Sequence, residues 1–465
     1  MNIWKDTYPI IISCSRGMVP QTSLELTRMG YAIVDATDNT VVVRGKMRDM
    51  MRLNLQLRTA HRILVPLLRT ECRHLRELYD AAYTIDWENL LEDDGYFMVN
   101  SVVSNDTVRD TRMPSLKTKD AIADRIRDHR GGRPDSGRET HGAAVFVYWQ
   151  DTELIIYLDT TGEPLSRRGY RKLPGPAPMQ ETLAAGCVIA TGWDARTPFV
   201  LPMCGSGTPA IEAALIAINR APGNFKSHFG FMALKGYRIT IPGERAGNSV
   251  RQRFGASPEQ IWKEMVATAR AEERRDGIPP IIATDISAEA VEEAHMNAIA
   301  AGVAEYITFY ACDFADTKIP APDLSLAETQ RRGEGCEESN ASEATPLSSS
   351  LSAPPRLCER KTEGCGIIFL NPEYGERLGA DTDLEPLYRR IGDFLKQKCT
   401  GYTGCVFTAN DQMSRKIGLR SSRRIPFYSG PLDCRLIIFD LYNSPAADVV
   451  DVVGEAATTT KGESK

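Results

Sequence analysis

The chain has 465 residues, 42% of them hydrophobic, which is too much for one ordinary compact core and predicts two or three domains. Its net charge of −5 excludes a global basic field, so any nucleic-acid binding must come from local patches. The apolar runs are too short to cross a membrane, the first residues lack the features of a secretory signal, and the 11 cysteines lack metal-binding spacing, so we expect a cytoplasmic protein with no structural metal.

The first 163 residues predict two small α+β units. In residues 1–68, β-branched runs alternate with apolar residues at helical spacing, and the expected strands cover residues 10–13, 32–34 and 40–44. In residues 69–163 we expect a strand at 97–104, a basic helix at about 117–130, and strands at 143–150 and 153–161. Only Asp151 and Thr152 separate the last two strands, which is typical of a tight hairpin.

A Gly- and Pro-rich connector over residues 164–195 leads into an α/β domain over residues 196–443. Strand and helix signals alternate there as in a doubly wound parallel sheet. The expected strands are 199–201, 280–285, 306–312, 366–371, 404–410 and 435–443. Two segments, 321–365 and 444–465, have too few large apolar side chains to offset the entropy of ordering, so we expect them to be disordered.

A glycine-rich turn, Leu201 to Thr208, follows the first strand of this domain and precedes a helix. Its glycines, Gly205 and Gly207, let the backbone turn sharply beside the free N–H groups of the helix N-terminus. A nucleotide-like ligand would fit at such a turn. A plain strand-to-helix connection is the alternative, because short glycine motifs discriminate loosely.

Two aspartates end the next two strands. Asp285 is placed to accept the hydroxyls of a ribose, and Asp313 to accept from an adenine amino group. Asp285 follows Gly207 by 78 residues instead of the 20 or so of a dinucleotide-binding unit, which disfavours a nicotinamide dehydrogenase and predicts a large insertion at about 221–277. Capping the next helix, for Asp285, and opening a loop, for Asp313, are the structural alternatives.

The sequence Asn371-Pro372-Glu373-Tyr374 directly follows a strand that we expect to be buried. The exocyclic amine of a nucleobase is a poor nucleophile, because its lone pair is delocalised into the ring. Two oxygens, the Asn371 side chain and the Pro372 carbonyl, can accept its two N–H bonds and stabilise the charge that develops on nitrogen. Tyr374 would stack on the extruded base. A simple turn opened by Asn-Pro is the alternative.

Taken together, these motifs resemble the THUMP-containing class I methyltransferases that use S-adenosylmethionine to methylate the guanine N2 amine of bacterial 23S ribosomal RNA. The family motif DPMCGSGT followed by IEAA is matched here by LPMCGSGT followed by IEAA. The family motif NPPYGERLG is matched by NPEYGERLG. Five further stretches are also similar to the family: LNLQLRTAHRIL, SLKTKDAIADRIR, RRGYRK with APMQETLAA, LYRRIGDFLKQK and SRRIPFYSGPLDCRL. The resemblance covers most of residues 8–442.

The resemblance implies a Rossmann-like methyltransferase domain preceded by a ferredoxin-like and THUMP region that binds ribosomal RNA. It implies cofactor contacts at Cys204, Gly205, Gly207, Asp285 and Asp313, and target-amine contacts at Asn371, Pro372 and Tyr374. Two residues depart from the family pattern. Leu201 replaces an Asp that would face the cofactor, and Glu373 replaces the second Pro of NPPY, which removes backbone stiffness and adds an acid that could accept the guanine N1–H.

RNA binding is also predicted from local charge. Residues 109–138 hold nine Lys and Arg against five Asp, residues 166–172 add four cations, and residues 414–424 add five. Such clusters are typical of phosphate-binding surfaces, although solvated helix faces are the alternative. The candidate RNA contacts are Lys117, Lys119, Arg125, Arg167, Arg168, Arg171, Arg423 and Arg424.

The sequence therefore predicts an RNA methyltransferase that acts on guanine N2. Two other functions stay open. A catalytically impaired RNA-binding or ribosome-assembly protein is suggested by Leu201 and Glu373. Methylation of adenine N6 is the second, because motifs of the NPxY type serve both amines.

Overall fold

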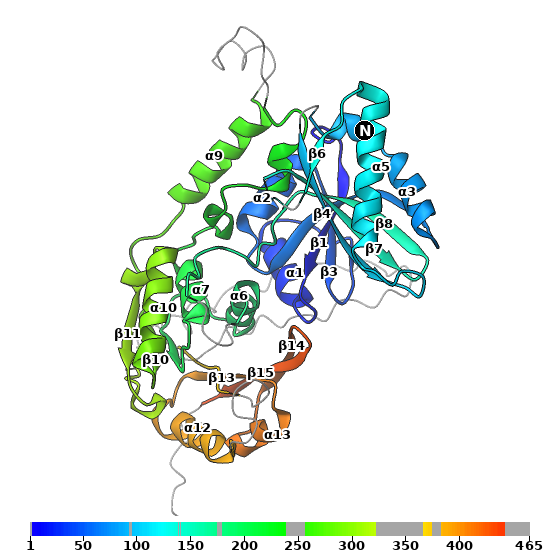
Figure 1. The fold of residues 1–465 in the computed structure, drawn as a ribbon. Coiled ribbons are helices and arrows are strands. Elements are labelled where there is room, and N and C mark those ends of the chain that lie inside the picture. The colour runs from blue at the N-terminus through cyan, green and yellow to red at the C-terminus, as the bar shows by residue number, and fades with distance from the viewer. Residues whose placement is uncertain are drawn as a thin grey trace, which may run out of the picture.

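The computed structural model describes residues 2–92, 95–137, 139, 141–173, 179–238, 256–321, 366–373 and 383–441. The protein has two halves, each built around one β-sheet (Figure 1). The predicted disordered segments, apart from residue 321, lie outside the described residues, and so does Tyr374. Within the described residues, no helix combines the length and apolar character that a membrane crossing requires.

The first half contains eight strands in the order β2-β3-β1-β4-β8-β7-β5-β6. The strands are β1 (Tyr8–Cys14), β2 (Asp35–Ala36), β3 (Thr40–Gly45), β4 (Ala60–Glu71), β5 (Tyr96–Ser104), β6 (Asp135–Ser136), β7 (Ala143–Gln150) and β8 (Glu153–Asp159). The helices are α1 (Val19–Arg28), α2 (Met47–Gln56), α3 (Leu75–Tyr83), α4 (Trp87–Leu90) and α5 (Met113–Arg130). The strand expected at 32–34 does not form, and pairing begins at Asp35 because only Val34 of that run bonds to β3.

Strand β4 joins the two predicted N-terminal units into one sheet. Residues Ala60 to Leu64 pair with β1, and residues Leu64 to Glu71 pair with β8. The boundary that we expected after residue 68 therefore falls inside a strand. Pro66 lies where the register with β8 shifts, which is a usual place for a proline within a sheet.

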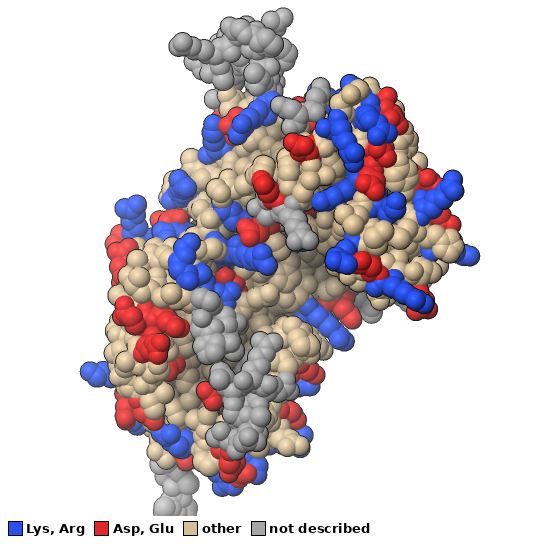
Figure 2. Space-filling view, viewed as in Figure 1, with Lys and Arg blue, Asp and Glu red and all other residues tan. Residues whose placement is uncertain are grey.

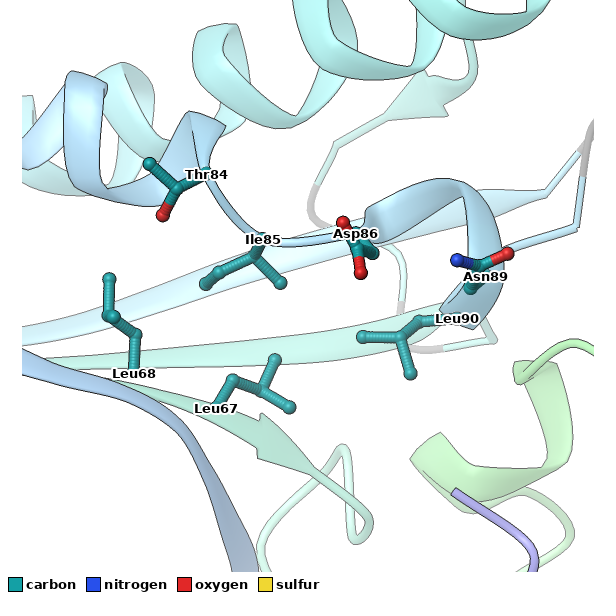
Figure 3. A pocket seen from close by; sticks show the side chains of 7 residues that line it. All are labelled: Leu67, Leu68, Thr84, Ile85, Asp86, Asn89 and Leu90. Atoms are coloured by element: carbon teal, nitrogen blue, oxygen red, sulfur yellow. The ribbon is translucent and has the colours of Figure 1, made fainter. Parts of the chain in front are cut away.

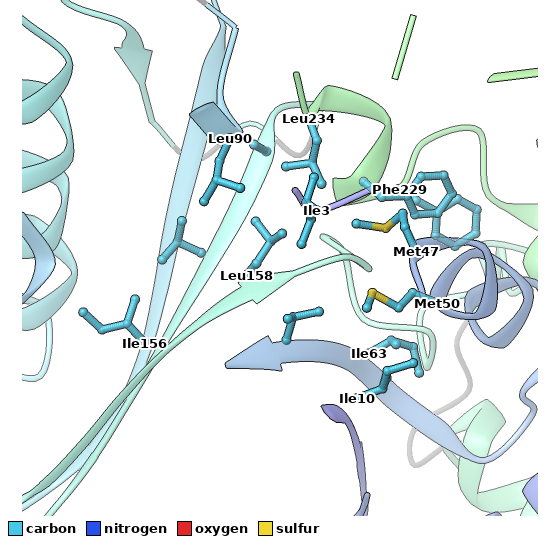
Figure 4. Close-up of a cluster of buried hydrophobic side chains, with 14 of the residues drawn as sticks. Ile3, Ile10, Met47, Met50, Ile63, Leu90, Ile156, Leu158, Phe229 and Leu234 are labelled. Atoms are coloured by element: carbon cyan, nitrogen blue, oxygen red, sulfur yellow. The ribbon is translucent and has the colours of Figure 1, made fainter. Parts of the chain in front are cut away.

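A single apolar core supports this sheet (Figure 4). Alternate residues of β1 and β3 point into it, so Ile10 and Ile12 are fully buried together with Val41 and Val43. Met47 and Met50 of α2 pack on the same cluster. The period-2 pattern of the strands and the helical spacing of α2 thus produce a common buried face.

The second half contains seven strands in the order β11-β10-β9-β12-β13-β15-β14. The strands are β9 (Phe199–Pro202), β10 (Ile281–Asp285), β11 (Ile307–Ala311), β12 (Ile367–Leu370), β13 (Thr403–Thr408), β14 (Arg423–Ser429) and β15 (Leu432–Asp440). The helices are α6 (Glu181–Ala190), α7 (Thr208–Ala217), α9 (Pro258–Ala271), α10 (Ala288–Ala301), α12 (Glu385–Lys398) and α13 (Asp411–Ser414). Short 3-10 turns are η1 (Pro222–Phe225), η2 (Gly230–Ala233), η3 (Ala304–Tyr306), η4 (Phe314–Asp316) and η5 (Arg415–Ile417).

Helices cover both faces of the second sheet. Phe199 and Leu201 of β9 point toward the core shared with α6, α7 and α10, whereas Val200 points toward the core shared with α12. The strands from β11 to β13 are parallel, and β15 runs antiparallel to β13 and β14. The chain builds β9, β10 and β11 toward one edge and then returns to place β12 on the other side of β9. This reversal makes β9 and β12 the switch point of the sheet.

The connection from α7 to β10 leaves the second half and packs on the core of the first. Its residues Phe229 and Phe231 lie edge-on to Trp262 of α9, with ring centroids 5.2 and 5.1 Å apart. All three belong to the apolar cluster of the first half, and Phe231 N–H donates to the Thr160 carbonyl at 3.1 Å. In Figure 1, α9 accordingly lies beside the first half. This connection fastens the two halves together.

A buried ion pair also links the halves. Arg168 is 2% exposed, and its guanidinium donates to the Glu212 carboxylate of α7 and to the Arg58 carbonyl, both at 2.6 Å. The Tyr170 hydroxyl donates to the other oxygen of Glu212 at 2.6 Å. The prediction that Arg168 contacts RNA is therefore wrong, because a side chain enclosed by its own partners cannot reach a phosphate.

We expect Arg168→Ala to lower the free energy of unfolding by about 3–5 kcal/mol, because it leaves the Glu212 carboxylate buried without its cation. The neighbouring Arg167 is 76% exposed in its side chain, so Arg167→Ala serves as the control and should change stability by less than about 0.5 kcal/mol. Denaturant unfolding of the two variants measures both values. Equal stability of the two variants would contradict a structural role for the buried pair.

Candidate functional site

The predicted site residues gather at one edge of the second sheet. Parallel strands end at the same edge, and β9 lies between β10 and β12. The glycine turn after β9, Asp285 at the end of β10 and Asn371 after β12 therefore lie around the switch point. Asp313 follows β11, the strand that lies next to β10 on the side away from β9.

The glycine turn is held by its neighbours. The N–H groups of Met203 and Cys204 both donate to the Thr284 carbonyl at 2.8 Å. Gly207 has a φ of +79°, and a Cβ there would lie 2.7 Å from the Ala294 Cβ, so only glycine fits. Asn297 of α10, which is fully buried, donates to the Ser206 carbonyl at 3.2 Å. The turn is thus a rigid support rather than a loose connection.

Asp285 joins this turn to β10. One carboxylate oxygen accepts from Gly205 N–H at 2.9 Å and the other from Ser287 N–H at 3.1 Å. Each oxygen keeps a lone pair for a further donor such as a ribose hydroxyl. Gly205 is exposed, and the space where its Cβ would lie is open. An anionic group could approach the N-terminus of α7 there, so these residues fit a nucleoside cofactor with a charged tail.

Two residues of the motif face inward. Cys204 is 5% exposed, and burial raises the pKa of its thiol, an effect strengthened by the charge of Asp285. The thiol therefore stays protonated. Leu201 is fully buried in the apolar core between the sheet and its helices, opposite Ala283 of β10. An apolar side chain suits this position, where the family pattern has an Asp that would face the cofactor.

Asp313 has a partner that the sequence did not indicate. Arg390 of α12 donates to both carboxylate oxygens, at 2.9 and 2.8 Å, and lies over the Phe314 ring. Partial burial acts to raise the pKa of Asp313, but the hydrogen bond and charge of Arg390 outweigh it, so the pKa lies below its usual value. Asp313 is thus ionised and held in place, and a cofactor amine would have to share it with Arg390.

The Asn371-Pro372-Glu373 corner follows β12. The Asn371 side-chain oxygen is buried and has no hydrogen-bond partner among the described residues. Pro372 is buried, whereas Glu373 is exposed. A buried acceptor without a donor is unusual in a folded protein and is often explained by a functional role. Tyr374, the predicted stacking residue, lies outside the described residues.

Most of the predicted RNA contacts are engaged within the protein. Arg125 is 15% exposed in its side chain and bonds to Asp86 and Glu88, and Arg171 bonds to the buried Glu181 at 2.9 Å. Neither pairing is evident from local charge, because the partners of Arg125 lie 37 and 39 residues away and Arg171 meets Glu181 only when the connector packs on α6. Basic and acidic side chains are accordingly interspersed over α5 in Figure 2.

The remaining predicted contacts are more open. Lys119 donates to the Gly137 carbonyl, Lys117 lies 3.9 Å from Asp120, and Arg424 bonds to Asp411 at 2.9 Å. Arg167 and Arg423 are exposed, the former 3.8 Å from Glu163. Arg424 is exposed as well, but its guanidinium is paired with Asp411.

The sequence analysis missed a stacked pair that spans the two halves. Arg16, just after β1, lies over the Tyr428 ring of β14 at 4.6 Å. Thr408 and Pro426 both lie opposite Arg435, so Tyr428 projects two residues beyond the end of β13, at the edge that carries the site. The loop packs closely on β14, since a Cβ at Gly17 would lie 2.7 Å from the Pro426 carbonyl oxygen. The family-like segment around Tyr428 was the available signal.

A cavity of about 210 Å³ lies in the first half, away from these residues (Figure 3). Leu67 and Leu68 of β4 form one wall, and Asp86 and Asn89 form a polar part of the rim. No predicted site residue lines it. Within the described residues, no group of three His, Cys, Asp or Glu side chains could hold a metal ion.

The fold of the second half, together with the residues at the edge where its parallel strands end, defines an α/β methyltransferase domain. A separate N-terminal half precedes it. Family models agree: the RMKL-like methyltransferase domain matches residues 168–325 and 339–438, the RlmL ferredoxin-like domain residues 9–64, and the THUMP domain residues 72–159. The chain belongs to the RMKL-like methyltransferase family. The predicted family and fold class are thereby confirmed. S-adenosylmethionine, the expected cofactor, is the methyl donor that fits a methyltransferase of this family.

Individual relatives extend over nearly the whole chain. The candidate RNA methyltransferase slr0064 of Synechocystis sp. is 28% identical over 436 residues, which cover 94% of this chain and 97% of that protein. The ribosomal RNA large subunit methyltransferase K/L of Methylococcus capsulatus is 29% identical over 459 residues, or 97% of this chain and 54% of that protein. The chain thus spans about half the length of the second relative. The solved structure of SMU.472, a candidate methyltransferase complexed with SAH, has a TM-score of 0.72 and 23% identity, with 94% of this chain and 98% of that chain covered.

We expect Asp285→Ala to weaken binding of S-adenosylmethionine about 10- to 100-fold, as the loss of hydrogen bonds to a charged acceptor should do. Isothermal titration calorimetry measures the dissociation constant. Asp316→Ala is the matched control, because that carboxylate is 74% exposed and its ion pair with Lys398 lies at the surface. An unchanged dissociation constant for Asp285→Ala would show that this residue does not bind the cofactor.

Proposed function

We propose that this chain transfers a methyl group from S-adenosylmethionine to the exocyclic N2 amine of a guanine in large-subunit ribosomal RNA. The observation that carries the proposal is the buried Asn371 side-chain oxygen, which has no donor among the residues that the structure describes and lies one strand away from the glycine turn. A base amine supplies the missing N–H. The names of the Synechocystis and Methylococcus relatives support an RNA substrate, the second one ribosomal RNA.

The chemistry follows from the placement of the acceptors. The Asn371 oxygen and the Pro372 carbonyl accept the two N–H bonds of the amine, which directs its lone pair toward the methyl group and stabilises positive charge as it forms. Bound S-adenosylmethionine supplies an electrophilic methyl group. Holding both reactants at one sheet edge provides much of the acceleration through proximity. Tyr374 is placed to stack on the base.

The cofactor contacts in this proposal are Gly205, Gly207, Asp285, Asp313 and the backbone of Cys204. Asp285 accepts the ribose hydroxyls, and Asp313 accepts the adenine amine beside Arg390. The N-terminus of α7 faces the carboxylate of the methionine part. SMU.472, which holds SAH in its solved structure, has a similar fold.

The proposed RNA path uses exposed cations of both halves. Arg423 begins β14 level with Cys405 of β13, so it lies below the edge that carries the site. Arg423 and Arg167 supply phosphate contacts, and the Arg16–Tyr428 pair offers a flat surface on which a base can stack. Because Arg16 comes from the first half and Tyr428 from the second, a bound RNA touches both. Lys117, Lys119 and Arg424 stay as weaker candidates, because each already has a contact.

The decisive experiment incubates ribosomal RNA lacking the modification with the protein and labelled S-adenosylmethionine, and maps the product by mass spectrometry. N2-methylguanine is the expected product. N6-methyladenine would replace the proposal with the adenine alternative. Calorimetric binding of the cofactor to the protein without any transfer would favour an impaired RNA-binding protein.

We expect Asn371→Ala to lower kcat about 10²- to 10³-fold, the usual cost of removing one group that stabilises charge in the transition state. The affinity for S-adenosylmethionine should stay within about twofold, because Asn371 contacts the target and not the donor. Steady-state kinetics and calorimetry measure the two quantities. Asn89→Ala, at an exposed asparagine of the first half, is the control. A weakened cofactor affinity with unchanged kcat would contradict the role of Asn371.

We expect Arg423→Ala to weaken RNA binding irrespective of sequence and to reduce the slope of log affinity against log salt by about one. The slope comes from titrations of labelled RNA at several salt concentrations. Lys263→Ala on α9 is the matched control, because its side chain is also exposed, at 70%, but lies far from β14 in the fold. The same slope change in both variants would show that Arg423 is no special contact.

A further inference from the structure

We infer that Tyr388 is a positioning residue that holds the Asn371-Pro372-Glu373 corner in the shape that receives the target base; this inference rests on the proposed function. Tyr388 lies on α12 and is fully buried. Its hydroxyl lies 3.3 Å from the Glu373 carbonyl oxygen and 2.7 Å from the Thr408 hydroxyl at the end of β13. It therefore connects the corner to the neighbouring strand.

The direction of these hydrogen bonds follows from the available donors. The Glu373 carbonyl can only accept, so the single O–H of Tyr388 donates to it. The Thr408 hydroxyl must then donate to the Tyr388 oxygen, and it accepts in turn from Asn410 N–H at 3.0 Å. The result is a chain of three bonds that all point from β13 toward the corner. Bonds aligned in this way polarise and strengthen one another.

This series of hydrogen bonds determines which oxygens of the corner remain available to the substrate. The Glu373 carbonyl is occupied by Tyr388, so its peptide plane is fixed. The Asn371 side-chain oxygen, by contrast, has no partner within the described part of the chain. Tyr388 thus holds the third residue of the corner while the first faces the site with a free acceptor.

The same contact explains how this chain tolerates Glu373. A second proline would limit the backbone of the corner through its fixed φ, and glutamate lacks that restraint. The hydrogen bond from Tyr388 to the Glu373 carbonyl restrains the same residue on its other side, at the rotation about its Cα–C bond. Restraint by proline and restraint by the tyrosine hydroxyl should therefore substitute for each other, which makes the inference testable by a double substitution.

The experiment compares Tyr388→Phe in the parent chain and in a Glu373→Pro background. Phenylalanine keeps the buried ring and removes only the hydroxyl. In the parent we expect kcat to fall about 3- to 10-fold, as the loss of one neutral hydrogen bond should cause, with an unchanged affinity for S-adenosylmethionine and an unchanged KM for RNA. In the Glu373→Pro background the loss should be less than twofold, because proline supplies the restraint.

A second measurement needs no activity. Amide hydrogen exchange at residues 366–371 should accelerate in Tyr388→Phe, and this increase should vanish in the Glu373→Pro background. Residue 373 is left out of the comparison, because proline has no N–H. Tyr402→Phe is the matched control. Tyr402 is also buried in this half, and its hydroxyl donates to the Pro320 carbonyl at 2.6 Å, so its loss should leave both kcat and exchange at the corner unchanged.

Equal losses in both backgrounds, or unchanged exchange at the corner in Tyr388→Phe, would overturn the inference. The proposed function fails separately, if the parent protein methylates no RNA. In that case hydrogen exchange alone decides whether Tyr388 holds the corner. A loss of kcat accompanied by a fall in cofactor affinity would also overturn it, because it would show a general disturbance of the site.

Discussion

One constraint of the second sheet assembles the site: β9 and β12 are neighbours, although about 165 residues of chain separate them. Because parallel strands end at one edge, this neighbourhood brings the glycine turn beside the Asn371 corner. Neither motif could perform the reaction alone. The glycine turn and Asp285 offer groups for a nucleoside cofactor, and the corner offers an acceptor for an amine. The buried pairing of β9 with both β10 and β12 keeps the two groups in register.

The first half is fixed to this edge rather than merely tethered. The Arg168–Glu212 pair reaches from the connector to α7, the helix that begins at the glycine turn. The aromatic residues around Trp262 bind the long crossover to the opposite core. An RNA held by the first half would therefore meet the corner at a set distance and angle. The Arg16–Tyr428 pair lies where the two halves meet at this edge.

The sequence allowed the family, the fold class and most strands to be predicted, because glycine turns, strand patterns and extended motifs are local in the chain. It could not separate Arg167 from Arg168. These neighbours have the same charge, but one is exposed and the other is buried against Glu212, a contact made 44 residues away. The predictions for Arg125 and Arg171 were wrong for the same reason, since their acidic partners are set by tertiary packing.

The shared sheet of the first half was also not predicted, because β4 pairs with β1 on one side and with β8 on the other. Tyr388 and Arg390 belong to a family-like helix, but their roles appear only when α12 is placed against the sheet.

The most direct test of the central claim is a crystal structure of the protein with SAH and a guanine nucleoside. The account predicts that the N2 amine lies about 2.7–3.2 Å from both the Asn371 side-chain oxygen and the Pro372 carbonyl, with its free side toward the sulfur of SAH in the glycine turn. A base bound elsewhere, or a corner whose oxygens face away from the sulfur, would contradict it.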